Sequence, residues 1–168
     1  MREAVKMSKY VTSKRRVARL AAVQCIYTWT LNRISPQDIV YQFLEFHAEN
    51  QAELDIDLDH YRNLFFHTVS NIKRIDQEIA KFSSREITQL DPIVLAILRV
   101  ATYELTSKSV LPAVAINEAI EITKAIAGTG SYAFVNSILD RIKNHLVDNE
   151  PAFELEKSDD KDENDVNI

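Results

Sequence analysis

The shortage of glycine is the feature that most restricts how this chain can fold. The 168 residues contain two glycines, Gly128 and Gly130, and both lie within the stretch Leu111–Ile142. A chain this poor in glycine uses the residue where the backbone requires its conformational freedom. No segment alternates apolar and polar residues between turn signals, which argues against a sheet. The sequence therefore predicts an all-α protein with a glycine hinge between two helices.

The hinge permits a structural role and a binding role at once. Gly128 is expected to be a left-handed cap that ends one helix, and Ser131 or Thr129 would cap the next. The N-terminus of that next helix presents free N–H groups and a partial positive charge, which suit a phosphate. This next helix also carries Tyr132. The structural role of the hinge as a helix cap is compatible with its role in binding.

The helices before the hinge are predicted from apolar periodicity and from start signals. A first helix is expected from Thr12 or Ser13 to about Leu31, and a second helix begins at Ser35-Pro36. One long third helix is predicted over 58–82.

Two further start signals follow the long helix. Ser83-x-x-Glu86 has the pattern of a capping box, and Asp91-Pro92 is typical of a helix start. Residues 93–98 are apolar on every side, which indicates a buried helix. Polar residues then return at positions 99, 103 and 104, before a further helix begins at Pro112.

Charge is distributed unevenly along the chain. Residues 1–20 hold seven basic side chains against one acidic one, whereas residues 148–168 hold nine acidic side chains against two lysines. We therefore divide the chain into a flexible basic leader at 1–12, a helical domain at 13–147 and a disordered acidic tail at 148–168.

Three arginines lie within the first predicted helix, at Arg15, Arg16 and Arg19. Arg15 and Arg19 are four residues apart and share a helix face. A solvated basic surface is one interpretation. The other is an anion-binding patch for RNA or another polyanion, because guanidinium groups make bidentate contacts with phosphate.

The sequence lacks the motifs of an enzyme. It contains no P-loop, no dinucleotide-binding glycine pattern, no zinc-ligand spacing and no nucleophile elbow. The single cysteine, Cys25, lies among apolar residues of the first helix and is expected to be a core thiol. We therefore expect no catalytic residues, no metal and no cofactor. With no membrane-spanning run and no secretory signal, a cytoplasmic protein is predicted.

Four collinear segments, together spanning about Lys14 to Lys143, resemble the NusB family of bacterial transcription antitermination factors. They are RRVARLAAVQCIYTW from Arg15, LDPIVLAILRVATYEL from Leu90, VAINEAIEITKAI and SYAFVNSILDRI. The resemblance implies two small helical bundles packed at an angle, with six to seven helices in all. It also implies a factor that binds the boxA segment of nascent ribosomal RNA leaders together with the ribosomal protein NusE. Other Nus factors and RNA polymerase would be indirect partners.

The resemblance also assigns roles to particular residues. It places RNA contacts at two groups of positions, Arg15, Arg16 and Arg19 in the first helix, and Gly130, Ser131, Tyr132, Phe134 and Asn136 at the hinge. It places the protein partner at Tyr27 and Val94. Many members have a charged pair where this chain has Val94 and Leu95, and some have a polar residue in place of Gly130.

Two other functions remain open. NusB-like domains also occur fused to ribosomal RNA methyltransferases, where they dock RNA, although this chain leaves no room for a cofactor-binding sheet domain. A helical scaffold that binds proteins alone is the third possibility, and the basic first helix argues against it.

Overall fold

The computed structural model describes residues 13–49 and 55–149, and all of its regular structure is helical. These residues form seven α-helices and one 3₁₀ helix, with no strand among them, which confirms the predicted fold class. The elements are α2 (Lys14–Asn32), α3 (Pro36–Glu49), α4 (Leu58–Ser70), α5 (Ile72–Phe82), η1 (Ile87–Gln89), α6 (Pro92–Ser107), α7 (Pro112–Ile126) and α8 (Tyr132–Asp148). The predicted leader and nearly all of the predicted tail lie outside the described residues.

Three helix starts follow the predicted capping chemistry. The Ser13 side chain accepts a hydrogen bond from the backbone of Arg16 and begins α2. Ser35 accepts a hydrogen bond from Asp38 N at the start of α3. Asp91 accepts two backbone hydrogen bonds before α6, where Pro92 follows as the first helical residue. Each cap satisfies N–H groups that have no partner within their own helix.

The single helix predicted over 58–82 is wrong, because Asn71 divides it into α4 and α5. The Asn71 side chain donates a hydrogen bond to the carbonyl oxygen of His67, and the residue itself is 2% exposed. Ser70 donates in the same way to Phe66 O. Side-chain bonds of this kind compete with the helical hydrogen-bond pattern and bend the chain. The bend lets α4 pack on α2 while α5 packs on α6 and α8.

The capping box predicted at Ser83 and Glu86 is also wrong. Ser83 ends α5, and its hydroxyl accepts from Arg85 N and donates to Arg85 O in a local turn. Glu86 precedes the short η1 without a side-chain capping bond. The pattern Ser-x-x-Glu is satisfied by the turn, so no α-helix begins there.

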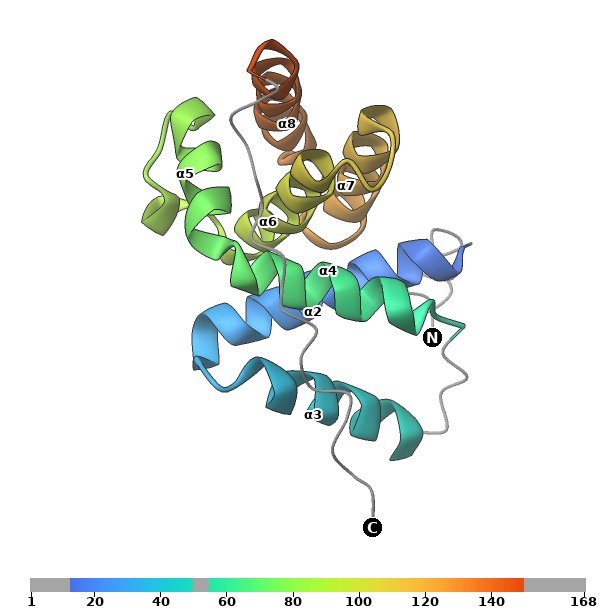
Figure 1. The fold of residues 1–168 in the computed structure, drawn as a ribbon. Helices are drawn as coiled ribbons and strands as arrows, with labels where there is room; N and C mark the ends of the chain where they lie inside the picture. The colour runs from blue at the N-terminus through green and yellow to red at the C-terminus, as the bar shows by residue number, and fades with distance from the viewer. Residues whose placement is uncertain (1–12, 50–54, 150–168) are drawn as a thin grey trace.

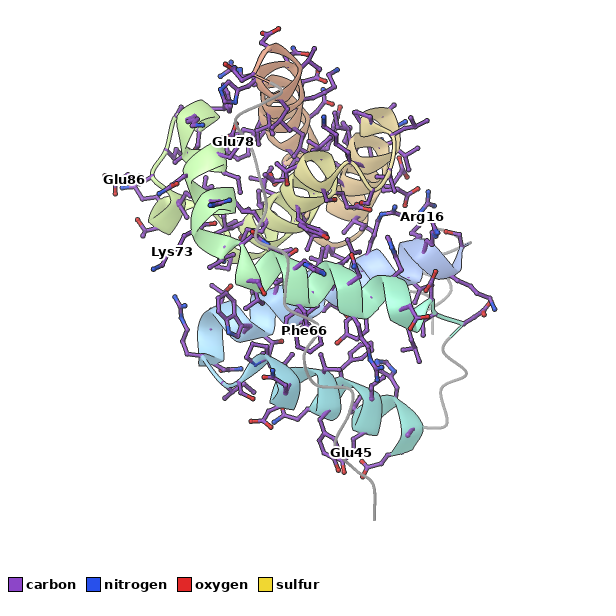
Figure 2. The ribbon with its side chains drawn as sticks, in the orientation of Figure 1. Arg16, Glu45, Phe66, Lys73, Glu78 and Glu86 are labelled. Carbon is purple, nitrogen blue, oxygen red and sulfur yellow. The ribbon has the colours of Figure 1, made fainter. Side chains whose placement is uncertain are left out.

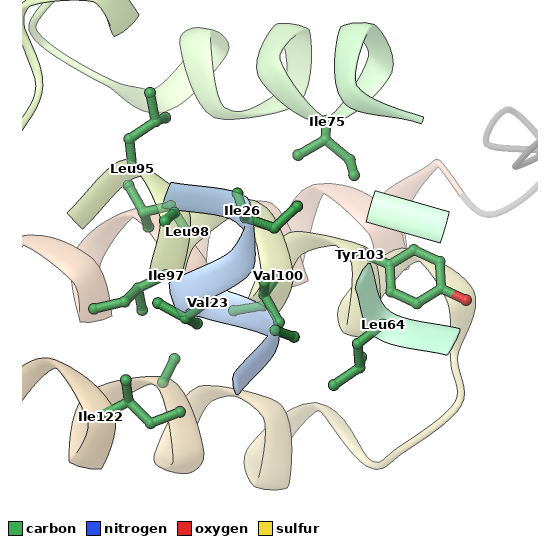
Figure 3. Packing of buried hydrophobic residues seen from close by; sticks show 14 of the residues in the cluster. Val23, Ile26, Leu64, Ile75, Leu95, Ile97, Leu98, Val100, Tyr103 and Ile122 are labelled. Carbon is green, nitrogen blue, oxygen red and sulfur yellow. The ribbon is translucent and has the colours of Figure 1, made fainter. Parts of the chain in front are cut away.

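Helix α6 is the centre of the molecule. Every residue from Val94 to Thr106 is buried, which confirms the helix predicted from the apolar run at 93–98. Figure 3 shows Val23 and Ile26 of α2 packed among Leu98 and Val100 of α6. The polar residues at positions 99, 103 and 104 are buried as well, at most 7% exposed.

The helices form two small bundles that meet at α6, as predicted (Figure 1). Helices α2, α3 and α4 make one bundle, and α5, α6, α7 and α8 make the other. Helices α2 and α4 both pack against α6, so the apolar cores of the two bundles are continuous. Within the described residues, no helix is both long and apolar enough to cross a membrane.

Candidate nucleic-acid interface

The three arginines of α2 have different environments, so they do not form the predicted single patch. The Arg15 side chain is 62% exposed and lies 3.7 Å from an oxygen of Asp57. The Arg16 side chain is 24% exposed, and Arg19 is buried. Of the three, Arg15 presents its guanidinium to solvent most fully. Lys14, one position earlier, is 66% exposed and pairs with the exposed Asp55.

Arg19 is bound inside the protein by Glu104 of α6. Its Nε donates to both carboxylate oxygens at 3.0 Å, and Nη2 donates to Oε1 at 2.8 Å. The two side chains are 5% and 2% exposed. The expectation that Arg19 belongs to an exposed patch is therefore wrong, because its guanidinium is desolvated and its donors face a carboxylate. This pair joins α2 to α6.

His60 of α4 lies beside this buried pair. Burial, reinforced by the nearby guanidiniums of Arg19 and Arg15, lowers the pKa of His60 from 6.5 to about 4. The imidazole is therefore neutral near pH 7. Its Nε2 lies 3.7 Å from Glu104 Oε1, too far for a hydrogen bond, and is buried without one.

Arg16 is held by Glu118 of α7. Its Nε donates to Glu118 Oε2 at 2.8 Å, and Nη2 donates to Oε1 at 2.9 Å. The hydrogen bonds from Arg16 lower the pKa of Glu118 below its ordinary value, so the carboxylate stays ionised. Figure 2 shows Arg16 at the end of α2 that lies near α7. Glu118 is a residue of this region that the sequence did not indicate as a partner.

The hinge confirms the role predicted for Gly128 and corrects two other expectations. Gly128 has a φ of +80° and follows Ala127, the C-cap residue of α7, so it takes the left-handed position that ends the helix. Gly130 has no positive φ, and a Cβ added there meets nothing within 4 Å, so the backbone does not require glycine. Ser131 precedes α8, but its hydroxyl donates to Ala127 O at 3.5 Å and does not cap the new helix.

The first turn of α8 forms one wall of a cleft. Tyr132 is 42% exposed, and the ammonium of Lys124 lies 5.2 Å from the centre of its ring. The cleft has a volume of about 470 Å³ and is lined by Asn117, Ile120, Glu121, Lys124, Tyr132, Ala133 and Asn136. Asn136, which carries a side-chain amide, is thus one of the lining residues. Phe134 is half-buried and packs against the core.

Helix α7 brings the arginine region and the hinge region together. Arg16 of α2 pairs with Glu118 of α7. One turn further along α7, Glu121 pairs with Lys124 at 3.6 Å. Lys124 in turn lies over the ring of Tyr132. The two groups of predicted residues therefore lie on either side of α7. The α7 residues between them were not predicted as site residues.

The two residues predicted to contact a protein partner lie at different depths. Tyr27 is half-buried in α2 and packs against the core. Val94 is 4% exposed, and Leu95 is 6% exposed, so both belong to the core of α6. The expectation of Val94 as a surface contact does not agree with this burial.

The described residues contain no group of histidine, cysteine, aspartate or glutamate side chains that could hold a metal ion. Burial raises the pKa of Cys25 to about 11, and its Sγ lies 3.1 Å from the hydroxyl of Tyr61. The thiol is therefore protonated near neutral pH, as expected for a core cysteine.

Comparison with known families identifies the chain. The model of the NusB family matches residues 16–144. The chain belongs to the NusB family. The match spans the helices from α2 to α8 and confirms the resemblance seen in the four sequence segments.

Individual NusB proteins are similar over most of their length. The transcription antitermination protein NusB of Aeromonas salmonicida (strain A449) is 42% identical over 131 residues, which cover 77% of this chain and 93% of the relative. The protein of the same name from Pasteurella multocida (strain Pm70) is 40% identical over 131 residues, covering 77% and 88%.

Solved NusB structures share the fold. A crystal structure of antitermination factors NusB and NusE in complex with dsRNA matches with a TM-score of 0.68 and 26% identity, covering 79% of this chain and 97% of that one. A NusB from T. maritima matches with a TM-score of 0.64 and 29% identity, covering 80% and 93%.

Proposed function

We propose that this NusB-family chain is a transcription antitermination factor that binds boxA RNA of nascent ribosomal RNA leaders together with NusE. Other Nus factors and RNA polymerase are its indirect partners, and the cytoplasm is the proposed place of action. The observation that carries the proposal is the likeness to a NusB solved together with NusE and RNA. The family relatives, named transcription antitermination proteins, support it.

The proposed phosphate contacts are exposed cations at the start of α2 and on α7. Lys14, Arg15 and Lys124 pair with carboxylates, but both partners of each pair are about a third exposed or more. Exposed ion pairs of this kind contribute about 0–1 kcal/mol, so a phosphate can replace the carboxylate at little cost. Arg16 and Arg19 support this surface from inside through their glutamates.

The cleft beside Tyr132 suits an unstacked base. Single-stranded RNA is recognised by stacking on aromatic rings and by hydrogen bonds to base edges. Tyr132 offers a ring, while Asn136 and Asn117 offer amide groups in the same cleft. In this proposal Gly130 and Ser131 allow the strand to approach the start of α8, and Phe134 supports it from below.

The proposed NusE contacts, Tyr27 and Val94, differ in their exposure. Tyr27 remains the proposed contact for NusE, because its ring is partly accessible on α2. Val94 would act by shaping the surface from within, since it is buried. Val94 and Leu95 stand where many family members have a charged pair, and both are buried here, so we propose that charge at these two positions does not hold NusE in this protein.

A titration of labelled boxA-like RNA, with and without purified NusE, tests the function. We expect NusE to strengthen binding and a scrambled strand of equal length to bind more weakly. Three phosphate contacts on a single strand predict that log K falls against log salt with a slope of about −2. Equal affinity for boxA-like and scrambled RNA, both with and without NusE, contradicts the proposal.

A protein-only scaffold is the second candidate, because ion pairs already hold two of the three arginines of α2. Replacement of Arg15 by glutamine separates the two functions. We expect this change to weaken RNA binding and to leave binding of NusE unchanged. No RNA binding by the unchanged protein, with intact NusE binding, favours the scaffold.

A further inference from the structure

The ion pair between Arg16 and Glu118 differs from the ion pairs of its neighbours Lys14 and Arg15 at the start of α2. Two parallel hydrogen bonds of 2.8 and 2.9 Å join the guanidinium to the carboxylate, and the two side chains are 24% and 17% exposed. The neighbouring pair of Arg15 with Asp57 has a single distance of 3.7 Å and an arginine that is 62% exposed. Arg15 and Arg16 are adjacent in sequence, but Arg16 is bound much more tightly by its carboxylate partner than Arg15 is.

The strength of the pair decides what Arg16 can do when RNA arrives. A phosphate that took the same two donors would leave Glu118 partly buried and ionised, beside Glu121 one turn away. A bidentate, charge-assisted pair shielded from water is much stronger than an exposed ion pair. Replacing the Glu118 carboxylate by a phosphate at Arg16 therefore gains little free energy and leaves the carboxylate without its arginine partner. The pair is expected to persist in the complex.

The pair also joins two elements whose other buried contacts are partly made by small side chains. Where α2 faces α7, the α7 residues that line a narrow gap together with Val23 are Ala115, Ala119 and Ile122. Two of these three are alanines, which offer little apolar area for packing, so the ion pair adds to a connection of modest apolar contact. Glu118 is one turn from the Glu121–Lys124 pair, which leads to Tyr132.

We propose that Arg16 and Glu118 are positioning residues that hold the two halves of the RNA surface at a fixed separation. The cationic half is Lys14 and Arg15, and the aromatic half is the cleft at Tyr132. Holding both halves in place before binding raises the affinity of a strand that touches both, since less freedom is lost on association. This inference rests on the proposed RNA-binding function.

Glu118→Gln is the decisive variant. If the Arg16–Glu118 ion pair acts as a tether between α2 and α7, the substitution weakens RNA binding, whereas the loss of a negative charge alone would strengthen it. Removing an acidic group beside an RNA site ordinarily strengthens binding. If Glu118 is a tether, Glu118→Gln instead weakens binding of a boxA-like strand about fivefold, equivalent to about 1 kcal/mol of lost organisation. Glu121→Gln is the matched control, since it removes the same charge one turn away, and it should strengthen binding slightly.

Conservative variants of the two arginines separate positioning from phosphate contact. Lysine binds phosphate as a point charge but cannot make the two parallel bonds to a carboxylate. Arg15→Lys should therefore weaken RNA binding less than Arg16→Lys, which should lose about as much as Glu118→Gln. Arg15→Gln should also make the salt slope less negative by about 0.7, while Arg16→Gln should leave the slope unchanged. The double variant Arg16→Gln/Glu118→Gln should bind no more weakly than either single variant.

A probe that fills one half of the surface distinguishes positioning from damage to the fold. Tripolyphosphate can occupy the cationic half alone, so its affinity should be equal for the unchanged protein and for Glu118→Gln. Thermal midpoints measured on the same samples identify any variant that is unfolded, and Arg16→Lys then provides the second test.

The outcomes separate the tether from the function. RNA binding by Glu118→Gln that equals or exceeds that of the unchanged protein overturns the tether and leaves the function standing. A loss of slope in Arg16→Gln does the same, because it shows Arg16 on a phosphate. Absence of RNA binding by the unchanged protein overturns both.

Discussion

The two glycines of the hinge occur for different structural reasons, although they are only two positions apart. Gly128 adopts a φ of +80°, which an L-residue with a Cβ reaches at a cost of about 1–2 kcal/mol. Gly130 lies outside this region and has open space around the position of a Cβ. The backbone conformation thus requires glycine at position 128, whereas Gly130 leaves the surface beside Tyr132 without a side chain.

Alanine at the two positions should have opposite effects on stability. Gly128→Ala is expected to lower the free energy of unfolding by about 1–2 kcal/mol. Gly130→Ala is expected to raise it by roughly 0.5 kcal/mol, because alanine restricts the unfolded chain without straining the folded one. Urea denaturation of both variants measures the difference, and equal losses at the two sites would contradict the assignment.

His60 makes the stability of the protein depend on pH. The unfolded histidine takes up a proton as the pH falls below 6.5, whereas the folded one, with a pKa of about 4, does not. Stability is therefore fully present above pH 6.5 and declines as the pH falls toward 4. Between pH 7 and pH 5 the decline due to His60 is expected to be about 2 kcal/mol.

The variant His60→Gln isolates this contribution. Its stability should change little between pH 7 and pH 5, apart from the carboxylates that both proteins share. Chemical denaturation at several pH values gives the difference between the two curves. Parallel curves would show that His60 titrates normally in the folded protein.

Individual helices are connected through side chains that the apolar pattern does not reveal. The break at Asn71 leaves the spacing of Ile72, Ile75 and Ile79 intact, so periodicity alone predicts one helix over 58–82. Within α6, the charged residues Arg99 and Glu104 are buried with partners on other helices. Arg99 bonds to Asp76 of α5 and to Thr30 of α2, and Glu104 bonds to Arg19.

The pair of Arg19 with Glu104 should behave as a structural link between α2 and α6. Arg19→Met leaves a buried carboxylate without its partner and is expected to cost about 3–5 kcal/mol in the free energy of unfolding. The double variant Arg19→Met/Glu104→Met removes both charges and should cost far less. Urea denaturation gives these values.

RNA binding by the folded double variant then tests the role of Arg19. If Arg19 has no contact with phosphate, the double variant should bind boxA-like RNA with unchanged affinity and salt slope. A slope that became less negative by about 0.7 would assign a phosphate contact to Arg19 after all.

The whole molecule is organised around α6, which belongs to the core of both bundles. Hydrogen bonds from Arg99 and Tyr103 extend from α6 to α5, α2 and α4. Neither bundle therefore has a complete apolar core of its own. The RNA surface proposed above also spans both bundles, since α2 belongs to one and α7 and α8 belong to the other.

The two bundles should consequently unfold together. Trp29 is the single tryptophan of the chain and lies in α2, so its fluorescence reports on the bundle of α2, α3 and α4. Far-ultraviolet circular dichroism reports on all helices. We expect the two signals to give one common midpoint during thermal unfolding. An earlier transition of the fluorescence signal would show that the α2 bundle unfolds separately.

Local sequence patterns were enough to predict the helical class, most helix starts and the left-handed cap at Gly128. These features depend on local chemistry: a cap or a turn involves residues within four positions of one another, and the apolar run of α6 identifies a buried helix wherever it is placed. The collinear segments also sufficed to indicate the family.

The tertiary structure alone decided which arginines reach solvent and which are bound within the protein. Arg15, Arg16 and Arg19 are equivalent in sequence, but Glu118 is 102 positions from Arg16, and Glu104 is 85 positions from Arg19. Their environments depend on partners that folding brings from distant helices. For the same reason, no local pattern could show that α7 lies between the basic start of α2 and the hinge of Gly128 and Gly130.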